Sequence, residues 1–260
     1  MSGPLAGKRI LVTRPREQAG GLAALICDAG GEAILFPAIE IMDLADLNPF
    51  YAIADRLEEF DIAIFISPTA VERAIALLSG RRTGRPWPSR LRAVAIGRGS
   101  QRELEQRGFS QVLAPEGEAD SEALLALPGL AEVAGKRVVI FRGQGGRELL
   151  GDTLAARGAH VEYAECYRRA RPAQNVSATE PAWARRPLDA VTVSSGEGLA
   201  NLDAMLSAWR RDWLTESPLF VPHPRIAEEA ARRGARETVV AGPGDRETAL
   251  RLIAYFRGAK

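Results

Sequence analysis

The sequence predicts an α/β protein made of two doubly wound parallel-sheet domains. Three observations lead to this fold class: short β-branched runs alternate with amphipathic helical stretches, several strand-like runs are apolar throughout, and the 260-residue chain repeats itself. Continuously apolar strands are typical of parallel sheets that helices cover on both faces. Each half offers four or five strands, which is the size of a flavodoxin-like unit.

The repeat has a constant offset of 128 residues, measured from Gly7 to Gly135. The segment GKRILV, which begins at Gly7, falls on GKRVVI, which begins at Gly135. Further pairs at this offset are Arg14 with Arg142, Gly30 with Gly158, Asp61 with Asp189, and Ser67 with Ser195. The chain is therefore expected to be built twice from one unit of about half its length. The cleft between two such domains is where we expect the function.

Strand patterns and helix signals place the elements of the first half. Lys8–Thr13 is a strand, and Pro15 suits the first turn of a helix that ends before Gly30. Pro37 favours an edge position for the extended run Ala33–Ile41. The remaining expected elements are a helix from Asn48 to Glu59, strand Ile62–Ile66, a helix from Ser67 to Leu78, strand Ala93–Ile96, a helix from Gly97 to Gly108, strand Val112–Ala114 and a helix beginning at Asp120.

The second half repeats this order of elements. Strand Arg137–Phe141 leads through a glycine-rich turn into a helix that ends at Gly158, and a long extended run, His160–Arg168, follows. Arg171–Pro187 is polar and proline-rich, as in a linker. The remaining expected elements are strand Ala190–Ser194, a helix entered at Ser195, strand Leu219–Val221, a turn at His223–Arg225, helix Ile226–Arg233, strand Thr238–Ala241 and helix Arg246–Phe256.

Composition excludes several classes of function. The net charge of +1 gives no overall field for nucleic acid or an anionic membrane, so we expect neither partner. The N-terminus lacks an apolar stretch of signal-peptide length, and no apolar run approaches a membrane span, so a cytoplasmic location is expected. Cys27 and Cys166 are expected to be reduced packing residues. With only His160 and His223, a histidine-rich metal site is excluded, and no metal site is expected.

Candidate binding residues follow from the topology. Ligands of doubly wound sheets bind beyond the carboxyl ends of the strands. Helix N-termini with nearby arginines bind anions there. The residues selected by this rule are Thr13, Arg14, Ser67, Ser100, Arg142, Gly143, Ser195, Gly196 and Arg225. Any one of them alone is a turn with a helix cap. Their convergence on one cleft would make an anion site.

Other chemical interpretations of these segments are weaker. Gly143–Gly146 resembles a dinucleotide fingerprint, but Glu148 stands where the third glycine belongs. Ser67 and Ser195 lack a matching histidine, which favours capping and ligand contact over nucleophilic catalysis. Tyr167 is either a packing residue or a phenol that faces the cleft as a hydrogen-bond donor or weak acid.

Five segments, which together span nearly the whole chain, match one known family in the correct order. They are ILVTRPREQAGGLAALICDAGGEAILFPAIEI, FDIAIFISPTAVERAI, AVAIGRGSQRELEQRGF, VVIFRGQGGRELLGDTLAARGAHVEYAECYRR and VPHPRIAEEAARRGA. On these segments the chain resembles the bacterial uroporphyrinogen-III synthase family. The resemblance implies that residues 1–37 and 171–260 form one domain, that 42–163 form the other, and that 36–41 and 164–170 form a two-stranded ribbon joining them.

The implied reaction closes the linear tetrapyrrole hydroxymethylbilane to uroporphyrinogen III, with loss of water and inversion of ring D. Tyr167 matches the family's ribbon tyrosine and is the candidate acid, while Ser67, Ser100 and Ser195 match hydroxyl positions that line the cleft. Some members have Thr where this chain has Arg225. We expect no cofactor, and a monomer with at most transient contact with the preceding pathway enzyme. The alternatives are a non-enzymatic two-domain protein that closes on a small polyanion, and a nucleotide-dependent enzyme.

Overall fold

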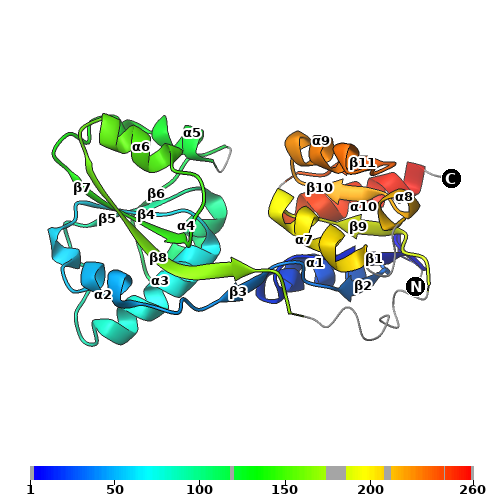
Figure 1. Ribbon diagram of the computed structural model, residues 1–260, viewed down its shortest axis with the longest axis horizontal. Coiled ribbons are helices and arrows are strands. Elements are labelled where there is room, and N and C mark those ends of the chain that lie inside the picture. Colours follow the sequence, from blue (N-terminus) through cyan, green and yellow to red (C-terminus); the bar gives the residue numbers. More distant parts are fainter. Residues whose placement is uncertain (1–2, 118–119, 174–185, 208–211, 243, 259–260) are drawn as a thin grey trace. The chain divides into compact units, whose positions relative to one another are not determined.

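The chain folds as two units in a computed structural model that describes residues 3–117, 120–173, 186–207, 212–242 and 244–258. Unit 1 comprises Met1–Ile41 together with Ala170–Lys260, and unit 2 comprises Met42–Arg169 (Figure 1). Most of the expected linker lies outside the described residues. Within the described residues, no helix has the length and apolar character that crossing a membrane requires.

Unit 1 is built on a five-stranded parallel sheet in the order β11-β10-β9-β1-β2. The strands are β1 (Arg9–Val12), β2 (Glu32–Leu35), β9 (Ala190–Thr192), β10 (Leu219–Val221) and β11 (Thr238–Val240). The helices are α1 (Arg16–Asp28), α7 (Gly196–Leu206), α8 (Trp213–Glu216), α9 (Pro224–Arg232) and α10 (Asp245–Gly258). Ile10 and Val12 pack with α1 and α10, whereas Leu11 packs with α7, α8 and α9. Because neighbouring side chains of a strand point to opposite faces, β1 contributes to the hydrophobic cores on both faces of the sheet.

Unit 2 has a six-stranded sheet in the order β3-β8-β7-β4-β5-β6. Its strands are β3 (Glu40–Met42), β4 (Ile62–Phe65), β5 (Arg92–Ala95), β6 (Val112–Leu113), β7 (Arg137–Gly143) and β8 (His160–Ala170). Its helices are α2 (Asn48–Ala54), η1 (Leu57–Glu59), α3 (Pro68–Arg81), α4 (Arg98–Gln106), α5 (Ser121–Leu125), η2 (Pro128–Leu130) and α6 (Leu149–Ala156). Helices α5 and α6 complete one core, and the aromatic rings of Phe65 and Phe141 stack at 4.8 Å in the other.

The predicted doubly wound parallel fold is confirmed, and the repeat is visible in its hydrogen bonds. Asp189 Oδ2 accepts from the Arg9 amide at 2.9 Å, and Asp61 Oδ2 accepts from the Arg137 amide at the same distance. The φ angles of Gly30 and Gly158 are 86° and 87°. The sequence offset matches each strand of the unit 1 sheet with one strand of the unit 2 sheet: β1 with β7, β2 with β8, β9 with β4, β10 with β5, and β11 with β6. Matched strands occupy the same places in the two sheets. The sheet of unit 1 therefore takes two strands from the first repeat and three from the second, while the sheet of unit 2 takes two from the second repeat and four from the first, because β3 is added at its edge.

The structure divides two of the expected elements. The extended run Ala33–Ile41 splits into β2 and β3, which belong to different sheets. The expected helix from Asn48 to Glu59 ends at Ala54 and resumes as η1, because Arg56 leaves the helical conformation with φ −120° and ψ 29°. Of the two ribbon stretches, 164–170 is the second half of β8, which pairs with β7 as far as Tyr167. The other neighbour of β8 in the sheet is β3, which contains the end of the 36–41 stretch.

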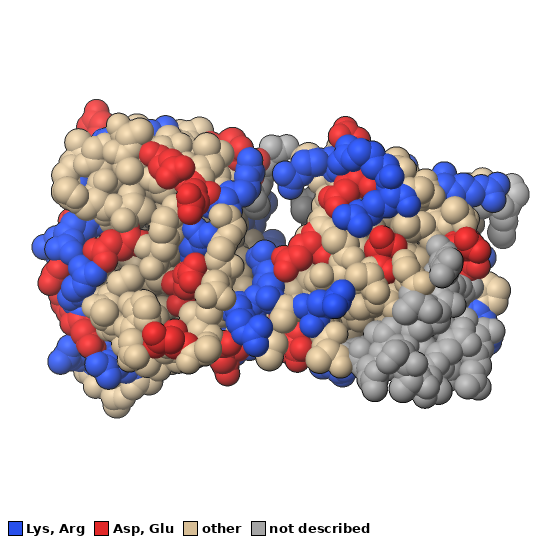
Figure 2. All heavy atoms as spheres, in the orientation of Figure 1, with Lys and Arg blue, Asp and Glu red and all other residues tan. Residues whose placement is uncertain are grey.

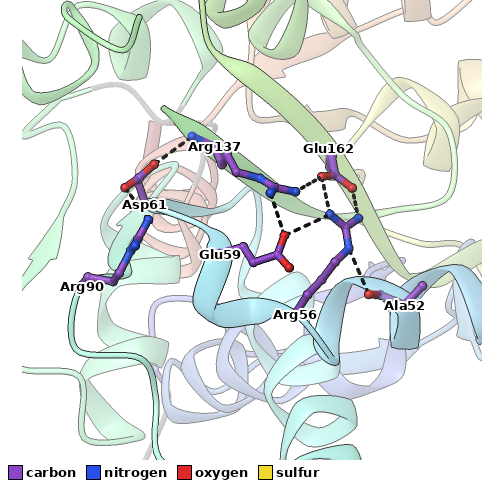
Figure 3. Close-up of polar contacts among 7 residues, drawn as sticks. All are labelled: Ala52, Arg56, Glu59, Asp61, Arg90, Arg137 and Glu162. Atoms are coloured by element: carbon purple, nitrogen blue, oxygen red, sulfur yellow. Dashed lines mark hydrogen bonds and ion pairs between the residues drawn. The ribbon is translucent and has the colours of Figure 1, made fainter. Parts of the chain in front are cut away.

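Residues near the amino ends of β4, β7 and β8 form an ionic cluster (Figure 3). Glu162 on β8 accepts from Arg56 at 3.0 Å and pairs with Arg137 at 3.4 Å, while Arg137 also pairs with Glu59 at 2.6 Å. The guanidinium groups of Arg56 and Arg137 both lie over the buried Phe60 ring, at 5.5 and 5.3 Å from its centroid respectively. The hydrogen bond from Arg56 holds the pKa of Glu162 below its ordinary value. The cluster connects η1 to two strands at the edge away from the candidate site.

Charged side chains are otherwise spread without one dominant sign. On the face drawn in Figure 2, cationic and anionic groups are interspersed over both units, in keeping with the net charge of +1.

Candidate functional site

Half of the predicted site residues lie at the carboxyl edge of the unit 2 sheet. Ser67 follows β4, Ser100 lies in the first turn of α4 after β5, Arg142 and Gly143 end β7, and Tyr167 lies on β8. Parallel strands end at a common edge, so the fold gathers these residues from segments far apart in the sequence.

Tyr167 is placed by a β-bulge. Arg142 pairs with Glu165 and Gly143 pairs with Tyr167, so Cys166 is the extra residue on β8. Such bulges re-aim a side chain, here the phenol. A Cβ atom on Gly143 would lie only 2.7 Å from Cε2 of the Tyr167 ring, which explains why the facing position is glycine. Tyr167 is 1 % exposed.

Two polar side chains among the described residues of unit 2 contact the phenol oxygen. Tyr167 Oη lies 3.2 Å from Ser67 Oγ, and Arg169 Nη2 donates to it at 3.4 Å. Ser67 also caps α3, because its Oγ accepts from the Ala70 amide at 2.9 Å. A phenol that accepts from a guanidinium can release its own proton while the charge left on oxygen is stabilised. This arrangement suits a general acid.

Arg169 was missed as a site residue in the sequence. The available signal was its spacing from Tyr167, because residues two apart on a strand point to the same face. Its hydrogen bond to the Tyr167 hydroxyl follows from that spacing.

Ser100 is 1 % exposed, and its Oγ has no hydrogen-bond partner among the residues that the structure describes. Buried hydroxyls are normally paired, so this one has capacity for an additional acceptor or donor. Its position at the N-terminus of α4 matches its predicted place as a binding residue.

Arg142 points into the protein. It is 4 % exposed, its guanidinium lies 4.6 Å above the Tyr163 ring, and it donates to the carbonyls of Gly143 and Gly145. Among the described residues, its side chain contacts the Tyr163 ring on β8 and the carbonyls of its own loop, and these contacts indicate an organising role.

The Cys166 thiol is not an active nucleophile in this arrangement. Burial raises the pKa of the Cys166 thiol to about 12, and its Sγ donates to the Arg142 carbonyl at 3.2 Å. Cys27 is a free thiol on the exposed face of α1, so the expectation that it packs internally is wrong. The helical period places Leu22 and Ile26 of α1 in the core instead.

The other predicted residues lie at the carboxyl edge of the unit 1 sheet. Thr13 Oγ1 donates to the Thr192 carbonyl at 2.7 Å, and Arg14 pairs with Asp245 at 2.5 Å. Ser195 caps α7 by accepting from the Gly198 amide at 3.0 Å, which confirms the capping prediction made for both serines.

Gly196 and Arg225 complete this group. A Cβ atom on Gly196 would lie 2.6 Å from Glu229 Oε2. Arg225 is exposed at the start of α9, and its guanidinium has no ion pair among the described residues. The Arg225 amide donates to His223 Nδ1 at 3.2 Å, so His223 is a helix cap.

A sequence model of one protein family, described as uroporphyrinogen-III synthase HemD, matches residues 21–250. The chain belongs to the uroporphyrinogen-III synthase family. The uroporphyrinogen-III synthase of Salmonella typhimurium is 38 % identical over 94 % of this chain and 99 % of its own length. That of Escherichia coli is 36 % identical over 94 % of this chain and 99 % of its own length.

Solved structures of uroporphyrinogen-III synthases share the fold. A mutant enzyme from Thermus thermophilus has a TM-score of 0.64 at 18 % identity, covering 98 % of this chain and 100 % of that one. The Helicobacter pylori enzyme has a TM-score of 0.58 at 15 % identity, covering 96 % and 100 %. At these identities the likeness supports the two-domain α/β fold alone.

Proposed function

We propose that this chain closes hydroxymethylbilane to uroporphyrinogen III, and that Tyr167 is the acid which assists loss of the hydroxyl group. Membership of the uroporphyrinogen-III synthase family supports the reaction. The observation that carries the residue assignment is the Tyr167 phenol, set against Gly143 and hydrogen-bonded to Ser67 and Arg169.

The first step breaks the carbon–oxygen bond of the hydroxymethyl group. The Tyr167 proton passes to the departing oxygen and water leaves. Electrons from the nitrogen of the pyrrole ring that carried the hydroxymethyl group then produce an azafulvene. Arg169 stabilises the negative charge left on the phenol oxygen, since it already donates to that atom. Ser67 fixes the orientation of the phenol while its Oγ caps α3.

Closure then requires the choice of a ring carbon. The substituted carbon of ring D attacks the activated carbon and gives a spiro-type intermediate. A bond of ring D migrates, and the proton finally lost from the ring restores the phenol. Without control the chain closes with ring D uninverted, so holding ring D in place is the main task of the protein. The reaction consumes no oxidant or reductant, and it releases only water.

Binding of the polyanionic substrate is assigned to helix N-termini. The substrate carries eight carboxylates, and the amide groups at the starts of α3 and α4 are suited to such anions. The buried Ser100 hydroxyl, which has no hydrogen-bond partner in the described part of the chain, supports a contact at α4. In unit 1 the exposed Arg225 at α9 offers a charge of the right sign.

We further propose that the protein works as a monomer in the cytoplasm and makes only transient contact with the enzyme that supplies its substrate. Sedimentation at micromolar concentration tests the monomer. A non-enzymatic polyanion binder is not favoured, because the matched relatives named as synthases are covered over nearly their whole length.

The deciding experiment incubates the purified protein with freshly generated hydroxymethylbilane and separates the oxidised porphyrin isomers. The expected product is isomer III, formed faster than the spontaneous reaction. Formation of isomer I alone, at the spontaneous rate, would reject the function. No thermal shift with NAD or ATP is expected, and a clear shift would revive the nucleotide alternative.

A further inference from the structure

Two side chains from neighbouring strands hold the glycine loop, defined here as Gly143–Gly146. Arg142 on β7 and Glu165 on β8 are register partners in the parallel pair. Arg142 Nη2 donates to the Gly145 carbonyl, and Glu165 Oε1 accepts from the Gly145 amide at 3.0 Å. Gly145 is therefore held through both of its backbone polar groups.

The loop depends on these contacts for its conformation. Gly145 and Gly146 have φ angles of +70° and +106°, which glycine adopts with little strain. A run of glycines also has a large conformational entropy to lose when it is ordered. A cation on the carbonyl side and a carboxylate on the amide side offset that loss, because charge-assisted hydrogen bonds are about twice as strong as neutral ones.

The ordered loop contacts the candidate acid at two points. Gly143 lies directly against the Tyr167 ring, and the Gln144 amide donates to the Tyr167 carbonyl at 2.7 Å. Movement of the loop would therefore move one wall of the space that the phenol occupies. Glu165 and Arg142 each contact the loop, and no contact between either side chain and the Tyr167 hydroxyl is found among the described residues.

We propose that Arg142 and Glu165 are positioning residues, which act through the glycine loop to keep the Tyr167 hydroxyl against Ser67. The inference rests on the proposed function in one respect, that Tyr167 is the acid. It assigns the Gly145 amide to Glu165 throughout the reaction, and it excludes that amide from substrate binding.

The test replaces Glu165 in two steps. Glu165→Gln keeps the size and leaves a neutral acceptor, whereas Glu165→Ala removes the acceptor. We expect kcat to fall about threefold for Gln and about tenfold for Ala, with KM within about twofold of the unaltered protein, because the loss falls on the placement of the acid. The share of isomer III in the product is expected to fall in the same order.

A double-mutant cycle shows whether the effect passes through the phenol. In a Tyr167→Phe background, Glu165→Ala is expected to change kcat less than about twofold, since the group that it positions is already gone. Arg142→Lys tests the other side chain that holds the loop. An ammonium group cannot reproduce the planar fork of guanidinium donors, so kcat is expected to fall with KM little changed.

The matched control is Glu162→Gln, a carboxylate of the same strand whose contacts are in the ionic cluster of Figure 3. It is expected to leave kcat and the isomer ratio unchanged. Thermal unfolding of each variant confirms that it is folded under assay conditions.

Two results would overturn the inference while the unaltered protein still makes isomer III. A lower KM with unchanged kcat in Glu165→Ala would mean that Glu165 competes with a substrate carboxylate for the Gly145 amide. An equal loss of kcat with and without the Tyr167 hydroxyl would mean that Glu165 acts independently of it. Failure of the unaltered protein to make isomer III would instead reject the proposed function.

Discussion

Substitution of Gly143 by alanine tests the packing of the candidate acid directly. The added Cβ would lie 2.7 Å from Cε2, 2.8 Å from Cζ and 3.1 Å from Oη of Tyr167. Carbon atoms attract one another best at about 3.5–4.0 Å, so the methyl group would overlap the ring by about 1 Å. The ring has little room to retreat, because Tyr167 is 1 % exposed and its hydroxyl contacts Ser67 and Arg169.

The expected cost follows from this overlap. Overpacking of a buried site destabilises a protein by about 1–3 kcal/mol. For a chain of this size each kcal/mol lowers Tm by about 2–4 °C, so Gly143→Ala is expected to lower Tm by about 2–12 °C. A displacement of about 1 Å in a catalytic group can cost about a hundredfold in rate, and we expect kcat to fall at least about tenfold.

Thermal unfolding and product analysis measure these two effects. Gly20→Ala is the matched control, because Gly20 lies in α1 with open space where the Cβ would be. It is expected to raise stability by about 0.5–1 kcal/mol through better helix propensity and to leave the rate unchanged. If Gly143→Ala behaved like Gly20→Ala in both assays, the contact between Gly143 and the phenol would not limit the position of Tyr167.

Three further predictions concern single groups. Tyr167→Phe is expected to lower kcat by about ten- to a hundredfold with the fold intact, and an unchanged kcat would make Tyr167 a packing residue. Glu162→Gln is expected to cost about 1 kcal/mol in urea unfolding at pH 7, because the lost ion pair with Arg56 is about one-third exposed. The pKa of Glu162 in the folded protein lies below its ordinary value of 4.5. The difference in free energy of unfolding between the unaltered protein and Glu162→Gln should therefore be full above pH 4.5 and shrink as the pH falls below it. A stability difference that grew in acid would contradict this expectation. A thiol reagent should modify the exposed Cys27 in the native protein and Cys166 only on unfolding, as mass spectrometry of the labelled peptides would show.

The fold was predictable because the chain is duplicated, so each half of the sequence supports the assignment of elements in the other half. The segments around Asp61 and Asp189 are recognisable in sequence, and they make the same backbone contacts in the two sheets. The exchange of strands between the repeats has no signature in hydrophobic periodicity, because β4 and β9 are both short buried strands that could pair with β1. The resemblance to a known family supplied that expectation.

The site was predictable in its membership more than in its contacts. Ser67 and Tyr167 are 100 positions apart, and their contact depends on a one-residue bulge that periodicity does not register. Arg142 was selected because it follows a strand, but pattern alone does not show whether an arginine faces a ligand or its own loop. The Ser100 hydroxyl, without a partner among the residues described, likewise becomes informative only when its burial is known.

The sharing of each sheet between both halves of the chain constrains how the protein is made on the ribosome. Residues 42–169 are contiguous, so this unit can close as soon as β8 has emerged. The β1-α1-β2 segment must wait for β9, as Thr13 and Thr192 are 179 positions apart. At about 5–20 residues per second, the roughly 150 residues between β2 and β9 take about 8–30 s to be synthesised. During that interval the apolar strand Arg9–Val12 has no partner on one side, and a nascent chain at this stage is exposed to chaperones that bind extended apolar segments.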